Sequence, residues 1–106
     1  MYPLYSASKA ALDALTKTMA VEFGKHKIRV LGFNPAGIQT NMAAQSMNLD
    51  PEVVAKMQEM MVGRYPLGEF MLPMEQVVNT ILFLASGIAG MMTGSSVVLD
   101  GGFLAT

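Results

Sequence analysis

Tyr5 and Lys9 are the residues whose types and spacing could carry out chemistry in this chain. They stand four residues apart in the run Tyr5–Leu12, which reads YSASKAAL. Residues at this separation are neighbours on a helix surface, so the Lys9 ammonium can approach the Tyr5 oxygen. A nearby positive charge favours the phenolate form of a tyrosine and makes it a general acid and base. The pair is therefore predicted to exchange a proton with a carbonyl or alcohol oxygen while another group moves a hydride.

The spacing also fits an ordinary solvated helix face, because tyrosine and lysine fall four apart by chance in many helices. Tyr2 offers no second pair of this kind, since the residue four positions later is Ser6, which carries no charge. The elements that hold Tyr5 and Lys9 must therefore decide between the two interpretations.

Composition excludes several classes of function. A chain of 106 residues is one domain at most, and its net charge of −1 argues against a nucleic-acid partner. There is no cysteine, hence neither a disulfide nor a thiolate metal site. The single histidine, His26, is flanked by Lys25 and Lys27 and is expected in an exposed turn, so no metal site is predicted.

No membrane span or signal peptide is predicted either. Met1 is not followed by a basic region leading into an apolar stretch. The uncharged stretch Gln76–Leu99 is long enough to cross a bilayer, but glycine, serine and threonine residues interrupt it. It fits a buried helix and a strand better.

The hydrophobic periodicity predicts three helices and two strands. The helices are expected at Leu4–Phe23 with Gly24 as C-cap, Asp50–Val62 with Pro51 at its first turn, and Met74–Ser86; the strands are expected at Ile28–Asn34 and Val97–Leu99. The third helix is expected to direct its apolar stripe inward, through Val77, Val78, Ile81, Leu82 and Leu84. The segment Asn41–Leu72 could form a lid over a substrate, because it carries several adaptable methionines, namely Met42, Met47, Met57, Met60, Met61 and Met71. For Met57, Met60 and Met61, which have helical spacing, packing of a helix against the core is preferred.

These elements predict an α/β fold that is incomplete. The strand Ile28–Asn34 is apolar on both faces, which suits a parallel strand covered by helices on both sides. Pro35–Asn41 follows its carboxyl end, the edge at which open α/β sheets bind ligands. Two strands cannot cover their own faces and edges. The chain is therefore predicted to be the second half of a larger domain.

Several linked motifs occur in a familiar order. Tyr5-x-x-x-Lys9 is followed by Ile28-Arg29-Val30, by the run Asn34–Thr40 and finally by Thr93-Gly94 and Asp100-Gly101-Gly102. In this order and spacing the chain resembles the C-terminal part of a short-chain dehydrogenase/reductase. The resemblance implies that residues 1–106 are the C-terminal portion of a Rossmann-like, doubly wound parallel sheet, with the N-terminal dinucleotide-binding half absent. The runs His26–Val30, Pro66–Phe70, Val77–Leu84 and Gly101–Phe103 are similar to the dicarbonyl/L-xylulose reductase and carbonyl reductase subfamily.

The resemblance also implies roles for individual residues. Tyr5 becomes the acid that protonates the substrate carbonyl, and Lys9 assists it and contacts the nicotinamide ribose. Pro35, Ile38 and Thr40 join Tyr5 and Lys9 in binding the cofactor, with NADP(H) favoured over NAD(H). One departure is Ala36, which stands where the family usually has glycine and which restricts φ. The family's glycine-rich turn and its catalytic asparagine and serine precede the tyrosine and do not occur in these 106 residues.

The implied activity is NAD(P)H-dependent reduction of a dicarbonyl or a keto sugar such as L-xylulose to an alcohol. The resemblance further implies a cytoplasmic homotetramer when full length, with this portion inactive alone. Two alternatives stay open: an inactive fragment that acts only through subunit association, and a short-chain reductase of ketoacyl or steroid substrates.

Overall fold

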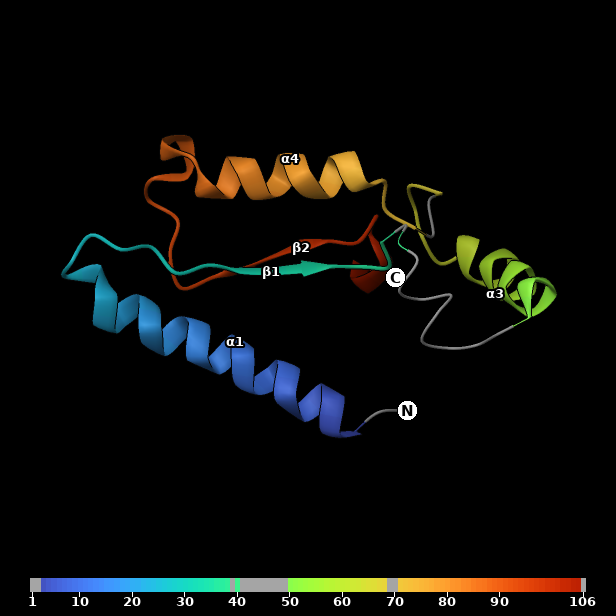
Figure 1. Cartoon of the computed structure of the whole chain (residues 1–106), viewed down its shortest axis with the longest axis horizontal. Coiled ribbons are helices and arrows are strands. Elements are labelled where there is room, and N and C mark those ends of the chain that lie inside the picture. Colours follow the sequence, from blue (N-terminus) through green and yellow to red (C-terminus); the bar gives the residue numbers. More distant parts are fainter. Residues whose placement is uncertain (1–2, 39, 41–49, 69–70, 106) are drawn as a thin grey trace. The chain divides into compact units, whose positions relative to one another are not determined.

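The structure, a computed structural model, describes residues 3–38, 40, 50–68 and 71–105. Its main elements are α1 (Pro3–Gly24), β1 (Gly32–Pro35), α3 (Pro51–Val62), α4 (Met74–Ala85) and β2 (Ser96–Leu99), as Figure 1 shows. Short 3-10 helices occupy Gly87–Ala89 and Phe103–Ala105. The chain divides into a first unit, Met1–Asn34 with Thr80–Val97, and a second unit, Pro35–Asn79 with Val98–Thr106.

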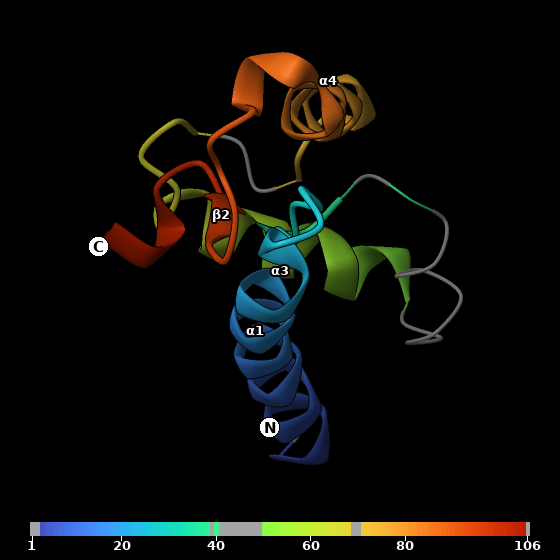
Figure 2. The same cartoon turned by 90° about the vertical axis from the view of Figure 1, so that its left-hand side faces the viewer.

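The first unit is built around a pair of parallel strands. Gly32 N donates to Ser95 O at 2.9 Å and Gly94 N donates to Val30 O at 2.8 Å, so the two segments run in the same direction. Within this unit, α1 lies on one side of the strands and the end of α4 on the other, in both ribbon views (Figures 1 and 2). The predicted strand with helices on both faces is thus confirmed.

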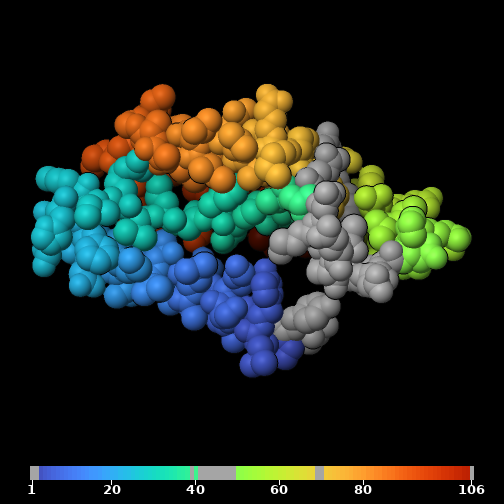
Figure 3. All heavy atoms as spheres, in the orientation of Figure 1, coloured from blue at the N-terminus to red at the C-terminus, as the bar shows by residue number. Residues whose placement is uncertain are grey.

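Small residues bring α1 close to the strands. Thr16 and Ala20 are buried on this helix, and a Cβ added at Gly94 would lie 3.3 Å from the Ala20 Cβ. Gly94 has φ of 71°, a conformation that suits glycine. Figure 3 shows the teal residues that lead into β1 between the blue helix α1 and the orange end of α4.

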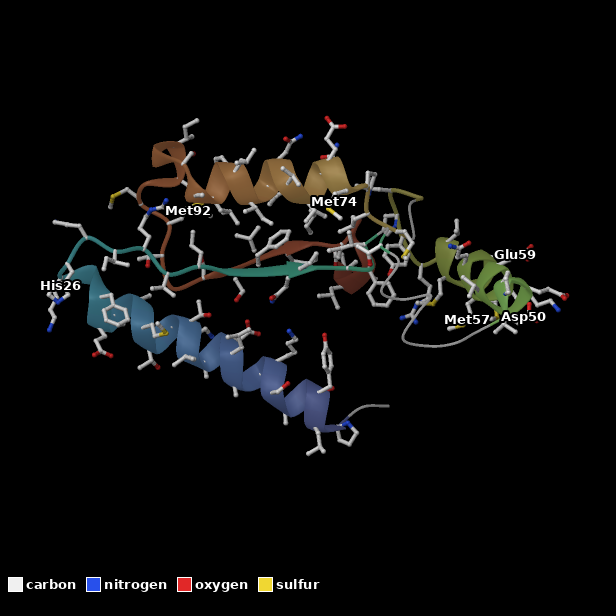
Figure 4. The ribbon with its side chains drawn as sticks, in the orientation of Figure 1. His26, Asp50, Met57, Glu59, Met74 and Met92 are labelled. Atoms are coloured by element: carbon white, nitrogen blue, oxygen red, sulfur yellow. The ribbon has the colours of Figure 1, made fainter. Side chains whose placement is uncertain are left out.

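The end of α1 differs from the prediction. The helix does end at Gly24, but the left-handed residue is Lys27, with φ of 60°. His26 N and Ile28 N both donate to Phe23 O, at 2.9 and 3.4 Å. Gly24 is therefore not the left-handed cap, because the chain makes a further turn before it reverses. His26 lies in this exposed turn, as predicted (Figure 4).

The first strand is shorter at its start than predicted. It covers Gly32–Pro35 rather than Ile28–Asn34. Val30 N donates to the Thr93 hydroxyl at 3.1 Å rather than to a backbone carbonyl of the neighbouring segment. The Val30 N–H thus has a side-chain partner while its carbonyl still accepts from Gly94 N, and apolar periodicity cannot reveal such a contact. The second strand, Ser96–Leu99, agrees with the prediction to within one residue.

The predicted inward stripe of α4 is only partly correct. Val77 and Leu84 are buried, whereas Val78, Ile81 and Leu82 are 44%, 47% and 62% exposed. The apolar stripe is wider than the surface that two strands offer, so its margins stay uncovered.

The second unit contains α3, whose bounds were predicted correctly. Asp50 caps it by accepting a 2.9 Å hydrogen bond from Glu52 N, and Pro51 occupies its first turn. The expected packing against the core is wrong for Met57 and Met60, which are 42% and 71% exposed, whereas Met61 is half-buried. Figure 4 labels Met57 on this helix.

The C-terminal turn of the second unit packs on the segment after α3. The rings of Tyr65 and Phe103 stack with centroids 5.0 Å apart, and the Arg64 guanidinium lies 4.7 Å from the Phe103 ring centre. Leu67 N donates to Gly101 O at 3.2 Å. The Asp100-Gly101-Gly102 turn closes the last strand as predicted, with Gly101 and Gly102 at φ of 61° and 88°.

Candidate active site

Tyr5 and Lys9 lie one turn apart near the start of α1. The Lys9 Nζ atom is 5.4 Å from the centre of the Tyr5 ring, inside the limit of about 6 Å for a cation–π contact. Tyr5 is 62% exposed. The two side chains are thus adjacent, as their spacing predicts; the catalytic role of the pair stays a prediction.

The helix around this pair is held locally. Ser8 Oγ donates a 2.7 Å hydrogen bond to the Tyr5 carbonyl oxygen, a bond that serine commonly makes within helices. Ser8 is therefore a backbone-bonding residue here.

The same helix carries a polar contact that sequence reasoning missed. Asp13, four residues after Lys9, accepts a 2.8 Å hydrogen bond from Ser96 Oγ at the start of β2. Both residues are half-buried. The signal in the sequence was an acidic residue on the helix face that also carries Tyr5 and Lys9, but its partner is 83 positions away.

The predicted cofactor residues Pro35, Ile38 and Thr40 belong to the second unit. Pro35 is the last residue of β1 and is half-buried, and Ala36 N donates to Leu99 O at 2.9 Å. Ile38 forms an isolated parallel bridge with Leu72, in which Leu72 N donates to Gly37 O at 2.7 Å. Thr40 is exposed.

This geometry leaves the backbone of Ile38 out of the bridge hydrogen bond, since the carbonyl used is that of Gly37. The loop tolerates Ala36 as well. Among the described residues, Lys27 is the non-glycine residue with positive φ, so Ala36 is not in a conformation that favours glycine. The departure from the family pattern at Ala36 therefore causes no strain.

A cavity of about 400 Å³ lies in the first unit, on the α4 side of the strands. Its lining is mostly apolar: Arg29, Leu31, Phe33, Ile81, Leu84 and Ala85. The Arg29 guanidinium donates to the carbonyl oxygens of Ser86 and Ala89 at 3.1 and 3.0 Å. That charge therefore has backbone partners, and the cavity lining includes none of the predicted site residues.

No group of three or more metal-ligating His, Asp or Glu side chains gathers among the residues described. Within the same residues, no helix combines the length and the apolar character needed to cross a membrane.

Comparison with known proteins supplies the context for this geometry. Residues 1–104 match the family model described as enoyl-(acyl carrier protein) reductase. The chain is 49% identical over 105 residues to L-xylulose reductase of Bos taurus, covering 99% of this chain and 41% of that protein. It is 46% identical over 103 residues to D-erythrulose reductase of Gallus gallus, covering 97% and 39%. It is 44% identical over 102 residues to carbonyl reductase [NADPH] 2 of Sus scrofa, covering 96% and 39%.

Solved structures show the same relationship. A short-chain type dehydrogenase/reductase from Mycobacterium marinum matches with a TM-score of 0.78 and 37% identity, over 96% of this chain and 37% of that one. A 4-hydroxyisoleucine dehydrogenase complexed with NADH matches with a TM-score of 0.77 and 35% identity, over 96% and 38%. The chain thus spans about two-fifths of the length of the relatives it matches.

Proposed function

This chain belongs to the short-chain dehydrogenase/reductase family of oxidoreductases, and from that premise we propose that it supplies the proton-transfer residues of a carbonyl reductase. It would do so as the C-terminal portion of the catalytic domain, residues 1–106. The reaction is the NAD(P)H-dependent reduction of a small dicarbonyl or keto sugar to an alcohol. The proximity of Lys9 to Tyr5, 5.4 Å from nitrogen to ring centre, is the observation that carries the proposal.

Tyr5 holds the proton that the product oxygen needs. When hydride reaches the carbonyl carbon, negative charge develops on the oxygen, and the Tyr5 hydroxyl donates its proton there. The Lys9 ammonium stabilises the phenolate that remains, because opposite charges at short range favour the charged form. Lys9 also offers donors to the hydroxyls of a ribose.

The loop after β1 is proposed to hold the cofactor. A bound nicotinamide supplies the hydride. The Ile38 backbone is not used by the bridge to Leu72, and the Thr40 side chain is exposed, so both fit a role in binding the carboxamide. Pro35 fixes φ at the point where the strand ends and the loop begins. The name of the porcine relative supports NADPH, and we propose NADP(H) over NAD(H) on that ground.

The names of the relatives favour a small ketose or dicarbonyl over an acyl thioester. L-xylulose and D-erythrulose, which name the bovine and chicken relatives, are both small keto sugars. The family description instead names an enoyl thioester reductase, and ketoacyl and steroid substrates are further alternatives. These substrate classes are therefore separate arms of the test.

The test assays the complete polypeptide that carries residues 1–106. NADPH oxidation is followed with L-xylulose, with diacetyl, with a steroid ketone, and with ketoacyl and enoyl thioesters. We expect turnover with the first two; turnover confined to the steroid or to a thioester would reject the substrate class, and no turnover with any of them would reject the function. A chimaera that carries this chain in place of the matched segment of the bovine enzyme tests the same residues in a relative named as a reductase.

The assembly and location follow as further proposals. The outer face of α1 exposes Leu4, Leu15 and Val21 at 86%, 51% and 85%, which suits contact with a second subunit. We propose a homotetramer in the cytoplasm, and sedimentation of the complete polypeptide tests the assembly.

A further inference from the structure

We propose that Asp13 and Ser96 form an anchoring pair that positions Tyr5 and Lys9 for proton transfer. The inference rests on the proposed function, because it concerns the residues assigned to that transfer. The Ser96 hydroxyl donates to Asp13 Oδ1 at 2.8 Å in a partly buried setting. A hydrogen bond to a charged acceptor is among the stronger polar contacts in proteins, so it can fix the helix against the strand.

The pair lies on the helix face that carries Tyr5 and Lys9. Positions four apart on a helix differ in direction by about 40°, so Tyr5, Lys9 and Asp13 form one gently curving row. The row continues into the buried residues Thr16 and Ala20, which face the strands. Because the Asp13 side chain is held toward β2, it also sets the direction in which Tyr5 and Lys9 leave the same helix.

Within the residues described, the burial of α1 begins at the anchoring pair. Residues 3–12 of α1 are all exposed, and Asp13 is the first residue of α1 that is half-buried. Tyr5 lies eight residues before Asp13, a distance of about 12 Å along the helix axis. A tilt of about 5° at the anchor moves Tyr5 by about 1 Å, and a misplacement of that size can cost about 10²-fold in rate.

Gly32 makes room for the anchoring pair. A Cβ added at Gly32 would collide with the Ser96 hydroxyl, although the φ of Gly32 is not positive. The hydroxyl thus fits between β1 and α1 only because the residue beside it has no side chain. Three elements of the first unit meet at this one oxygen, which is what an anchor requires.

The experiment measures kcat, KM and thermal unfolding in the complete polypeptide with saturating NADPH. Ser96→Ala and Asp13→Ala remove the bond, while Asp13→Asn keeps an oxygen that can still accept it. Thr18→Ala is the matched control, because the Thr18 hydroxyl bonds within the helix, to the Ala14 carbonyl at 3.1 Å. The concentration of active sites, which is needed to calculate kcat, is determined for each variant from the stoichiometry of NADPH binding.

We expect Ser96→Ala and Asp13→Ala each to lower kcat at least tenfold, with KM changed less than threefold. Asp13→Asn, which keeps a neutral acceptor, should lose less activity than Asp13→Ala, and Thr18→Ala should stay within threefold of wild type. The double alanine variant should be no slower than either single variant, since both remove the same contact. A kcat that stays within threefold in Ser96→Ala, with only the melting temperature lowered, would show a merely structural bond and overturn the proposal.

Amide hydrogen exchange separates this inference from the proposed function. In Ser96→Ala, exchange of residues 5–12 should accelerate at least fivefold, whereas Thr18→Ala should leave it unchanged; unchanged exchange in Ser96→Ala overturns the anchor. If the wild-type polypeptide reduces no carbonyl compound, the proposed function fails and this exchange comparison alone decides the anchor.

Discussion

The ammonium nitrogen of Lys9 lies 5.4 Å from the centre of the Tyr5 ring, one turn further along the same helix. Nothing in this contact depends on distant parts of the chain, because the α-helix alone places the two residues together. Residues far away in the sequence, such as Ser96 in its bond to Asp13, instead determine the direction in which Tyr5 and Lys9 point.

Replacing Lys9 by methionine should impair the enzyme in two separable ways. In the proposed mechanism Lys9 stabilises the charge left on Tyr5 after proton transfer, so we expect kcat to fall by about 10²-fold or more. The affinity for NADPH should also fall, since the proposed ribose contact is lost. Steady-state kinetics with parallel cofactor titrations measure both effects.

The matched control for this variant is Lys17→Met, which removes a lysine from the same helix two turns away. A kcat and an NADPH affinity that stay within threefold of wild type in Lys9→Met, or that fall equally in Lys17→Met, would contradict the assigned role of Lys9.

Much of the fold could be predicted from the sequence because it is set by local pattern. The bounds of α3 and α4 follow from apolar periodicity, and Asp50-Pro51 identifies the start of α3. The proximity of Tyr5 and Lys9 follows from helix geometry alone. These features need no knowledge of what lies opposite each element.

The errors arose where a partner decides the outcome. The first strand begins at Gly32 because Val30 N binds the Thr93 side chain, 63 positions away. Ile81 and Leu82 were predicted to face inward but are exposed. Periodicity identifies an apolar stripe on a helix but not how much of that stripe another element covers. The Asp13–Ser96 bond joins residues far apart in the chain, and no short-range pattern identifies such a pair.

Gly94 and Gly24 should respond differently to alanine substitution, because Gly94 has a positive φ and Gly24 lies in a helix. Gly94→Ala should destabilise the complete polypeptide by about 1–2 kcal/mol, since φ is 71° and the new Cβ would approach Ala20 to 3.3 Å. Gly24→Ala should instead be neutral or stabilise by up to about 1 kcal/mol, because it lies in α1 with nothing within 4 Å of its added Cβ. Urea unfolding measures both, and equal effects would contradict this assignment.

Arg29 should matter for stability although it is not proposed to take part in the reaction. Its guanidinium donates to the carbonyl oxygens of Ser86 and Ala89, which follow α4. Arg29→Met leaves these carbonyls without that donor and should cost about 2–3 kcal/mol in the free energy of unfolding. Lys56→Met is the control, since its exposed pair with Glu52 should contribute less than about 0.5 kcal/mol. A smaller effect for Arg29 than for Lys56 in chemical denaturation would refute this.

The segment 1–106 expressed alone should self-associate. Large apolar side chains are open to solvent in the first unit, among them Leu4, Val21 and Ile88 at 86%, 85% and 85% exposed. Exposed apolar surface of this kind promotes association. Sedimentation velocity and binding of a hydrophobic dye check this, and a monodisperse monomer that binds no dye would count against it.

The most direct test of the account is the effect of Tyr5→Phe on turnover in the complete polypeptide, or in the chimaera with the bovine relative. The substitution keeps the ring and removes the transferable proton. We predict that kcat for reduction of the carbonyl substrate by NADPH falls by about 10⁴-fold or more, while the Kd for NADPH changes less than threefold. Tyr2→Phe, the control, should leave both values unchanged. Turnover within tenfold of wild type in Tyr5→Phe, with cofactor still bound, would contradict the proposed role of Tyr5 and return Tyr5 and Lys9 to an ordinary helix surface.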